Sequence, residues 1–206
     1  MKKRKLVSIL GVIALFALAA APAVAYYSAK SPTVYNHFSI SKGAEEEDKA
    51  TVVESNWTDG AYDLQPGQIV PKNPVVTSNV DYTSKAYLGV AIPQVEGIVE
   101  GEDSVSLSDA VYLKDIGENW ELIETVPGDK NTPELQVYSY GVVLEKNEST
   151  TPTFSNIEIP NFISFSDNKK KSIDVKGYLV QSECISDEEA DAGAVAFFEK
   201  ELLEDE

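Results

Sequence analysis

The segment Ala86-Tyr87-Leu88-Gly89-Val90-Ala91-Ile92 is nearly all apolar. A short apolar run of this kind is typical of a strand in the interior of a sheet, with both of its faces covered. We therefore predict a β-sheet that has residues 86–92 at its centre, with the other strands of the chain arranged around it.

Several further segments have strand character, because they are short apolar runs or alternate apolar with polar residues. They are residues 51–57, 69–70, 75–77, 119–126, 135–144, 154–160 and 173–180. Pro66 and Gly67 suit the two central positions of a type II turn. Pro71 and Pro74 limit ladder hydrogen bonding, which is expected at the edge of a sheet. Gly141 is expected to interrupt the strand that contains it.

Two segments have helical character. Ser186-Asp187-Glu188-Glu189 is a capping box, and residues 190–203 have high helix propensity despite Gly193. An apolar stripe on this helix is formed by Ala194, Phe197, Phe198 and Leu202. Residues 106–116 are a candidate inserted helix, capped by Ser106 or Ser108 and ended by Gly117. The expected fold is mainly β: an antiparallel two-sheet, jelly-roll-like sandwich with a short C-terminal helix and this one candidate inserted helix.

The first 25 residues have the order of a cleaved secretory signal. A basic head at residues 2–5 precedes the apolar run 6–20, and the small residues Ala23 and Ala25 stand before Tyr26. This order is typical of a signal peptide. We expect cleavage of residues 1–25, secretion of the protein, and a single β-sandwich domain over residues 26–206.

The mature chain would begin with an aromatic-rich strand over residues 26–40. Tyr26 and Tyr27 follow the cleavage point, and residues 33–40 alternate in the manner of a strand with one buried face. The residues on one face are Val34, Asn36, Phe38 and Ile40. An aromatic strand at the newly exposed N-terminus is therefore the first candidate for function.

The charge of the chain is strongly negative. The chain has 17 Lys and Arg and 34 Asp and Glu, which gives a formal charge of −17. Four of the basic residues lie in the signal, so the formal charge becomes −21 after cleavage. Such a surface repels nucleic acid and anionic lipid headgroups, and we expect neither as a partner, nor a membrane attachment after cleavage. Cys184 is the only cysteine, so no internal disulfide forms. A buried, inert thiol is expected there, with an intermolecular bridge as the alternative.

The residues needed for known catalytic sets are scarce. His37 is the only histidine, whereas a zinc peptidase motif needs two histidines and a glutamate. A Ser-His-Asp triad would have to use His37. We therefore predict no catalytic residue, no metal site and no cofactor. The acidic runs at residues 45–48 and 100–103 lack the spacing of a defined calcium loop, so weak calcium binding has no motif behind it.

Seven short segments, taken together in chain order, carry a resemblance to a known family. They are Ala25-Tyr26-Tyr27-Ser28, Tyr35-Asn36-His37-Phe38-Ser39-Ile40, Leu64-Gln65-Pro66-Gly67, Lys72-Asn73-Pro74-Val75-Val76, Ala86-Tyr87-Leu88-Gly89-Val90, Ile157-Glu158-Ile159-Pro160 and residues 175–181. This ordered set resembles the TasA/camelysin family of secreted bacterial proteins. The resemblance implies a jelly-roll-like sandwich, a signal cut by a SipW-type signal peptidase, and a role as a fibre protein of the biofilm matrix. Camelysin is classed as a metallopeptidase, but this chain lacks an HExxH motif, so that activity is not transferred. The chain departs from the family pattern at residues 106–126 and at Cys184.

The hypothesis that follows is head-to-tail polymerisation by strand donation. An exposed sheet edge can pair with a strand from another chain, and residues 26–40 would be the donor. The proposed donor residues are Tyr26, Tyr27, Val34, Asn36, Phe38 and Ile40. Whether residues 34–40 instead stay in their own sheet is left open by the sequence. The alternatives are a camelysin-like cell-surface metalloendopeptidase and a monomeric envelope or adhesin protein.

Overall fold

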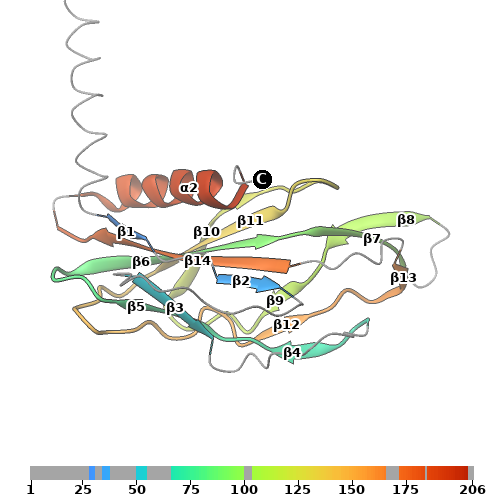
Figure 1. Cartoon of the computed structure of the whole chain (residues 1–206), viewed down its shortest axis with the longest axis horizontal. Coiled ribbons are helices and arrows are strands. Elements are labelled where there is room, and N and C mark those ends of the chain that lie inside the picture. The colour runs from blue at the N-terminus through green and yellow to red at the C-terminus, as the bar shows by residue number, and fades with distance from the viewer. Residues whose placement is uncertain are drawn as a thin grey trace, which may run out of the picture.

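The computed structural model describes residues 28–30, 34–37, 50–54, 66–99, 104–165, 172–183 and 185–203. Within them the chain is mainly β, with several antiparallel sheets and one helix at the C-terminal end (Figure 1). The elements are β1 Ser28–Lys30, β2 Val34–His37, β3 Ala50–Glu54, β4 Ile69–Pro71, β5 Pro74–Ser78, β6 Ser84–Ile92, β7 Gln94–Val99, β8 Val105–Asp109, β9 Tyr112–Lys114, β10 Trp120–Val126, β11 Glu134–Tyr140, β12 Asn156–Glu158, β13 Phe162–Phe165, β14 Ser172–Gln181 and α2 Asp187–Leu203.

The predicted central strand is confirmed as β6. It lies inside the largest sheet, between β14 and β11, in the order β1-β14-β6-β11-β10, with β2 also paired to β14. Every residue from Ala86 to Ile92 is buried. Leu88 points into the larger core cluster, whereas its neighbour Tyr87 points into a second cluster under α2. The run is continuously apolar because each face of the strand has its own cover.

The larger core joins the big sheet to two of the smaller sheets, the one that contains β5 and the one that contains β12. Val76 of β5 and Ile157 of β12 pack in the same cluster as Leu88 and Leu179 of the big sheet, and all four are fully buried. Burying one such side chain contributes roughly 1.5–3 kcal/mol. The smaller sheets have the orders β4-β12-β9, β13-β7-β8 and β3-β5.

A buried ion pair ties β3 to the chain between β4 and β5. The Lys72 ammonium lies 2.8 Å from the carboxylate of Glu54, and the Lys72 side chain is fully buried. Burial lowers the pKa of Lys72, and the neighbouring Glu54 carboxylate opposes that shift. Removing one partner would leave an uncompensated buried charge. Both partners are therefore needed to hold β3 against the chain that leads into β5.

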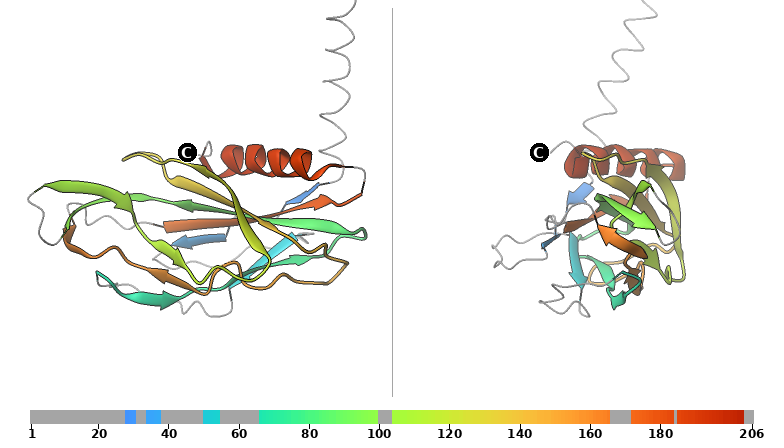
Figure 2. Two further views of the ribbon diagram at one scale, coloured as in Figure 1. Left: turned by 180° about the vertical axis from the view of Figure 1, so that it is seen from behind. Right: turned by 90° about the vertical axis from the view of Figure 1, so that its right-hand side faces the viewer.

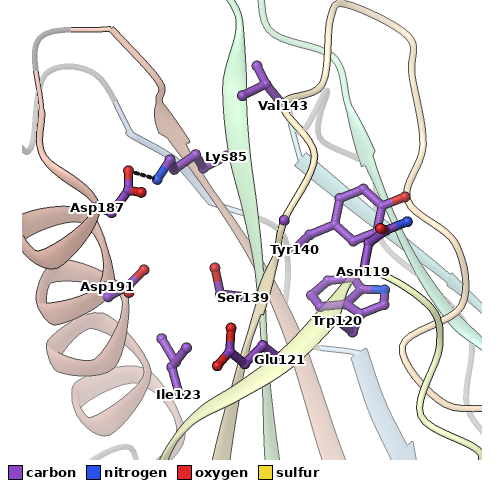
Figure 3. Close-up of a pocket in the computed structure, with 11 residues that line it drawn as sticks. Lys85, Asn119, Trp120, Glu121, Ile123, Ser139, Tyr140, Val143, Asp187 and Asp191 are labelled. Atoms are coloured by element: carbon purple, nitrogen blue, oxygen red, sulfur yellow. Dashed lines mark hydrogen bonds and ion pairs between the residues drawn. The ribbon is translucent and has the colours of Figure 1, made fainter.

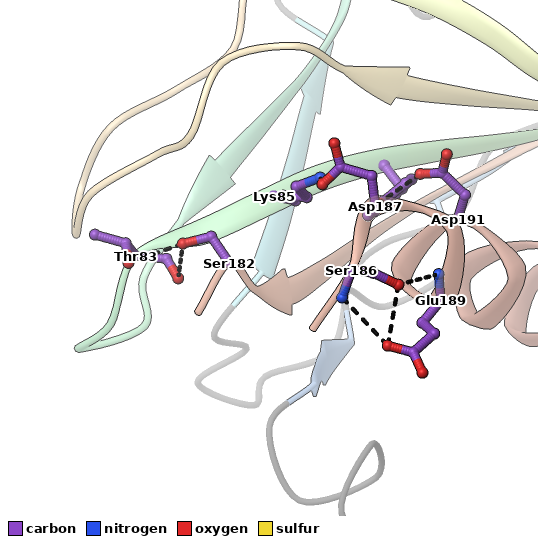
Figure 4. Close-up of polar contacts among 8 residues, drawn as sticks. Thr83, Lys85, Ser182, Ser186, Asp187, Glu189 and Asp191 are labelled. Carbon is purple, nitrogen blue, oxygen red and sulfur yellow. Dashed lines mark hydrogen bonds and ion pairs between the residues drawn. The ribbon is translucent and has the colours of Figure 1, made fainter. Parts of the chain in front are cut away.

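The C-terminal helix begins at the predicted capping box. The backbone N–H of Glu189 donates to Ser186 Oγ at 3.3 Å, and the N–H of Ser186 donates to the Glu189 carboxylate at 3.2 Å (Figure 4). Of the predicted apolar stripe, Ala194 and Phe198 are buried, and Phe197 is half-buried. They pack on β6, β11 and β14, which makes α2 the cover of one face of the large sheet (Figure 1).

The candidate inserted helix at residues 106–116 is wrong, because this segment forms β8 and β9. Serines alternate with Val105 and Leu107 in this segment, and serine has modest helix propensity. The partner strand β7, which has no counterpart among the sequence predictions, then pairs with β8 from Gln94↔Asp109 to Ile98↔Val105. β13 is a second strand absent from those predictions.

The predicted turn at Gly67 and the predicted strand interruption at Gly141 are confirmed. Gly67 has a φ of 72°, the left-handed value that the second central position of a type II turn requires. Strand β11 ends at Tyr140, directly before Gly141.

Candidate assembly edge

The outer edge of β14 carries the N-terminal strands. β14 pairs with β6 along one edge, and with β1 and β2 along the other (Figure 1). Ser28 lies opposite Val180, and His37 lies opposite Ser172. In the described part of the chain, β14 is the only strand with which either β1 or β2 pairs.

β1 and β2 run in the same direction relative to β14, and their registers with β14 differ by one residue. Lys30 pairs with Tyr178 and Val34 pairs with Val175, so the N-terminal segment advances four positions while β14 advances three. Both ladders are antiparallel. β1 and β2 therefore lie along the same edge in the same direction, with one residue more between them than between their partners on β14.

The structure describes the backbone of part of the predicted donor. Val34 and Asn36 lie in β2, opposite Val175 and Ile173. The other predicted donor and cleavage residues lie outside the described residues: Ala23, Ala25, Tyr26, Tyr27, Phe38 and Ile40. Cys184 lies outside them too.

β14 is held in place by elements other than the N-terminal strands. On the helix side, the ring of Tyr178 stacks on Phe197 with centroids 4.3 Å apart, and the Lys176 ammonium lies 2.6 Å from the Glu201 carboxylate. On the other side, a Cβ at Gly177 would come within 2.9 Å of Val52, so β3 packs directly on the backbone of β14. With β6 alongside as well, β14 is supported on three sides.

A surface cavity of about 460 Å³ lies between the first half of α2 and the sheet (Figure 3). Its polar lining comes from Lys85, Glu121, Ser139, Asp187 and Asp191. Lys85 forms an ion pair with Asp187, and the buried Tyr87 hydroxyl donates to Asp191 at 2.9 Å. Burial first, and the bond to Asp191 second, raise the pKa of Tyr87, so this phenol stays protonated and donating.

The cavity offers hydrogen bonds and negative charge to a small polar molecule. Its lining includes the hydroxyl residues Ser139 and Tyr140 and three carboxylates, whereas the chain's only histidine, His37, lies in β2 on the outer edge of β14. The cavity had no sequence prediction, because its residues come from four segments that share no motif.

Two features are absent from the described residues, a metal-binding cluster and a membrane-spanning helix. None of the His, Cys, Asp and Glu side chains there form a group of three or more that could hold a metal ion. No helix in that part of the chain is both long and apolar enough to cross a membrane.

Comparisons with family models, with curated proteins and with solved structures found no match for this chain. We therefore infer function from the residues of the chain and from the edge of β14.

Proposed function

We propose that this protein is a secreted structural protein whose copies assemble head-to-tail into extracellular fibres by exchanging their N-terminal segments. The observation that supports this most is that β1 and β2 lie at the margin of the largest sheet and pair with β14 alone among the described strands. A segment at the margin and at the start of the chain can leave without unthreading any other element.

In this exchange, the N-terminal segment of each copy is replaced on β14 by the identical segment of a neighbouring copy. A neighbouring copy can offer the same N-terminal residues to the same edge, and the ladders from Ser28↔Val180 to His37↔Ser172 re-form between subunits. Exchange of an identical element is a low-cost route to association. Because each copy gives its segment to one neighbour and receives one from another, the contact is heterologous and extends into a filament.

The cellular context belongs to the same proposal. Residues 1–25 would be removed by a SipW-type signal peptidase between Ala25 and Tyr26, which frees the donor end outside the cell. Fibres of this kind would serve in a bacterial biofilm matrix, as the resemblance to the TasA/camelysin family implies. A jelly-roll-like sandwich is the finer fold proposed, and the core shared by the large sheet with β5 and β12 supports it.

A cross-strand disulfide tests the exchange directly. In the signal-cleaved protein with Cys184→Ser, Ser28→Cys and Val180→Cys place two thiols on directly opposed residues of β1 and β14. Opposed residues of antiparallel strands have Cα atoms about 4.5–5.5 Å apart, within the range of about 4.4–6.8 Å that disulfides span. Oxidation of the dilute monomer locks the segment onto its own β14.

We expect the locked monomer to form no fibres by electron microscopy, and fibres to appear after reduction. Fibres assembled in reductant and then oxidised should yield a ladder of covalent multimers on a non-reducing gel, since each disulfide then joins two subunits. Each single-cysteine variant is the control and should give no band above a dimer. Fibres from the locked monomer, or only monomers after oxidation of fibres, would show that the N-terminal segment stays in its own sheet.

A further inference from the structure

The strands at the margins of the sheets differ in how they are protected against pairing with another chain. β10 has a register shift between Leu122 and Glu124, and its side chains there include exposed glutamates. β4 contains Pro71, and the three-residue β9 ends at Lys114. Bulges, prolines and lysines are the devices by which natural sheets prevent edge-to-edge association.

β8 has none of these devices. Its register with β7 is regular over all five residues, and Val105-Ser106-Leu107-Ser108-Asp109 contains no proline, glycine or lysine. Its second edge pairs with no described strand. Two apolar side chains on the same face of β8 are exposed, Val105 to 54% and Leu107 to 47%. An edge strand of this kind is a template for another strand.

The negative charge of the protein restricts which of its surfaces can contact a second copy. The signal-cleaved chain, with a formal charge of −21, repels its own copies over most of its surface. Residues 105–108 are uncharged, and the carboxylate of Asp109 is bonded by the side-chain amide of Gln94 on β7. Two β8 strands placed antiparallel therefore bring no like charges face to face at their centre.

We propose that β8 pairs antiparallel with β8 of a second copy and forms a two-fold symmetric dimer. An isologous contact uses the same strand on both subunits, so it closes at two. β8 lies at the opposite end of the long axis from β1 (Figures 1 and 2), so the contact leaves the edge of β14 free. The dimer does not depend on strand donation, and in fibres built by donation it would link one fibre to another.

Sedimentation of the locked monomer tests the dimer apart from strand exchange. The oxidised Ser28→Cys, Val180→Cys, Cys184→Ser protein is measured from about 1 µM to about 1 mM, because a contact of one short strand is weak. We expect a reversible monomer–dimer equilibrium. Leu107→Lys should raise its dissociation constant about tenfold or more, since two added charges then face each other across the pair.

Leu122→Lys is the matched control. The exposed fraction of Leu122, 48%, nearly equals the 47% of Leu107. Leu122 also lies on a terminal strand, but that strand has the register shift. This substitution should leave the equilibrium unchanged.

In the Cys184→Ser background, single cysteines at positions 105 to 108 should include at least one that forms an intermolecular disulfide. A monomer at all concentrations, a dimer that survives Leu107→Lys, or an equal loss with Leu122→Lys would overturn the proposal.

Discussion

Substitution of Gly89 by alanine tests the packing of α2 on the large sheet. A Cβ at Gly89 would lie 2.5 Å from Cδ1, 2.6 Å from Cγ and 3.0 Å from Cε1 of the Phe198 ring. The ring is fully buried, and it meets Tyr178 and Phe197 edge to face, with centroids 6.1 Å and 5.2 Å away. Because the ring is buried and packed against both neighbours, we expect the added methyl group to overpack the contact.

The expected magnitudes follow from this geometry. Overpacking a well-packed core costs about 1–3 kcal/mol, so Gly89→Ala should lower the free energy of unfolding by that amount. Phe198→Ala should cost about 3–5 kcal/mol through the lost burial and the cavity. In the double variant the obstructing ring is absent and the methyl group occupies part of the cavity. Its cost should fall below the sum of the single costs by about 1–3 kcal/mol.

Urea unfolding of the signal-cleaved protein measures these four free energies. Gly141→Ala is the control, because a Cβ there would meet only the carbonyl oxygen of Asn119 at 3.5 Å, an ordinary contact. Strictly additive costs for Gly89→Ala and Phe198→Ala, or a Gly89→Ala protein as stable as the parent, would refute the close approach of α2 to β6.

Two further predictions concern the helix cap and a buried phenol. Ser186→Ala removes the acceptor for the Glu189 N–H and should cost about 1 kcal/mol in urea unfolding, so an unchanged midpoint would contradict the capping box. Burial, helped by Glu134, raises the pKa of Tyr138 to about 12 from an ordinary value of 10.0. As pH rises from 10 towards 12 the unfolded chain loses this proton first, so stability should fall. Tyr138→Phe should reduce that fall in urea midpoints between pH 9 and 12, and an unchanged fall would contradict the raised pKa of Tyr138.

The elements that could be predicted from the sequence are those with a local cause. β6 was predictable because burial on both faces requires a continuous apolar run, and α2 because the cap from Ser186 to Glu189 acts within one turn. The turn at Gly67 was predictable because few residues other than glycine accept its positive φ. In each case the residues that cause the structure lie inside the element itself.

The elements that were not predictable depend on distant partners. The segment of β8 and β9 has Leu107, Ala110 and Val111 at spacings that suit a helix, and serines that suit a helix cap. Pairing with β7 decides for a strand, and that pairing is not a property of either segment alone. The edge of β14 is a stronger case, since β1 and β14 are separated by about 150 residues, and the sequence pattern left open where residues 34–40 lie.

The division of the N-terminal ladder bears on how an exchange would proceed. β1 contributes three residue pairs and β2 four, with the one-residue offset between them. A net contribution of about 0.5–1.5 kcal/mol per hydrogen bond makes each half weak alone. In the proposed exchange, one half would leave β14 while the other remains bound, and a neighbour's segment would occupy the vacated positions stepwise. Because β6, α2 and β3 contact β14 independently of β1 and β2, we expect the edge to keep its shape during this exchange. The barrier to the proposed exchange would then be set by the stronger half of the ladder rather than by the whole of it.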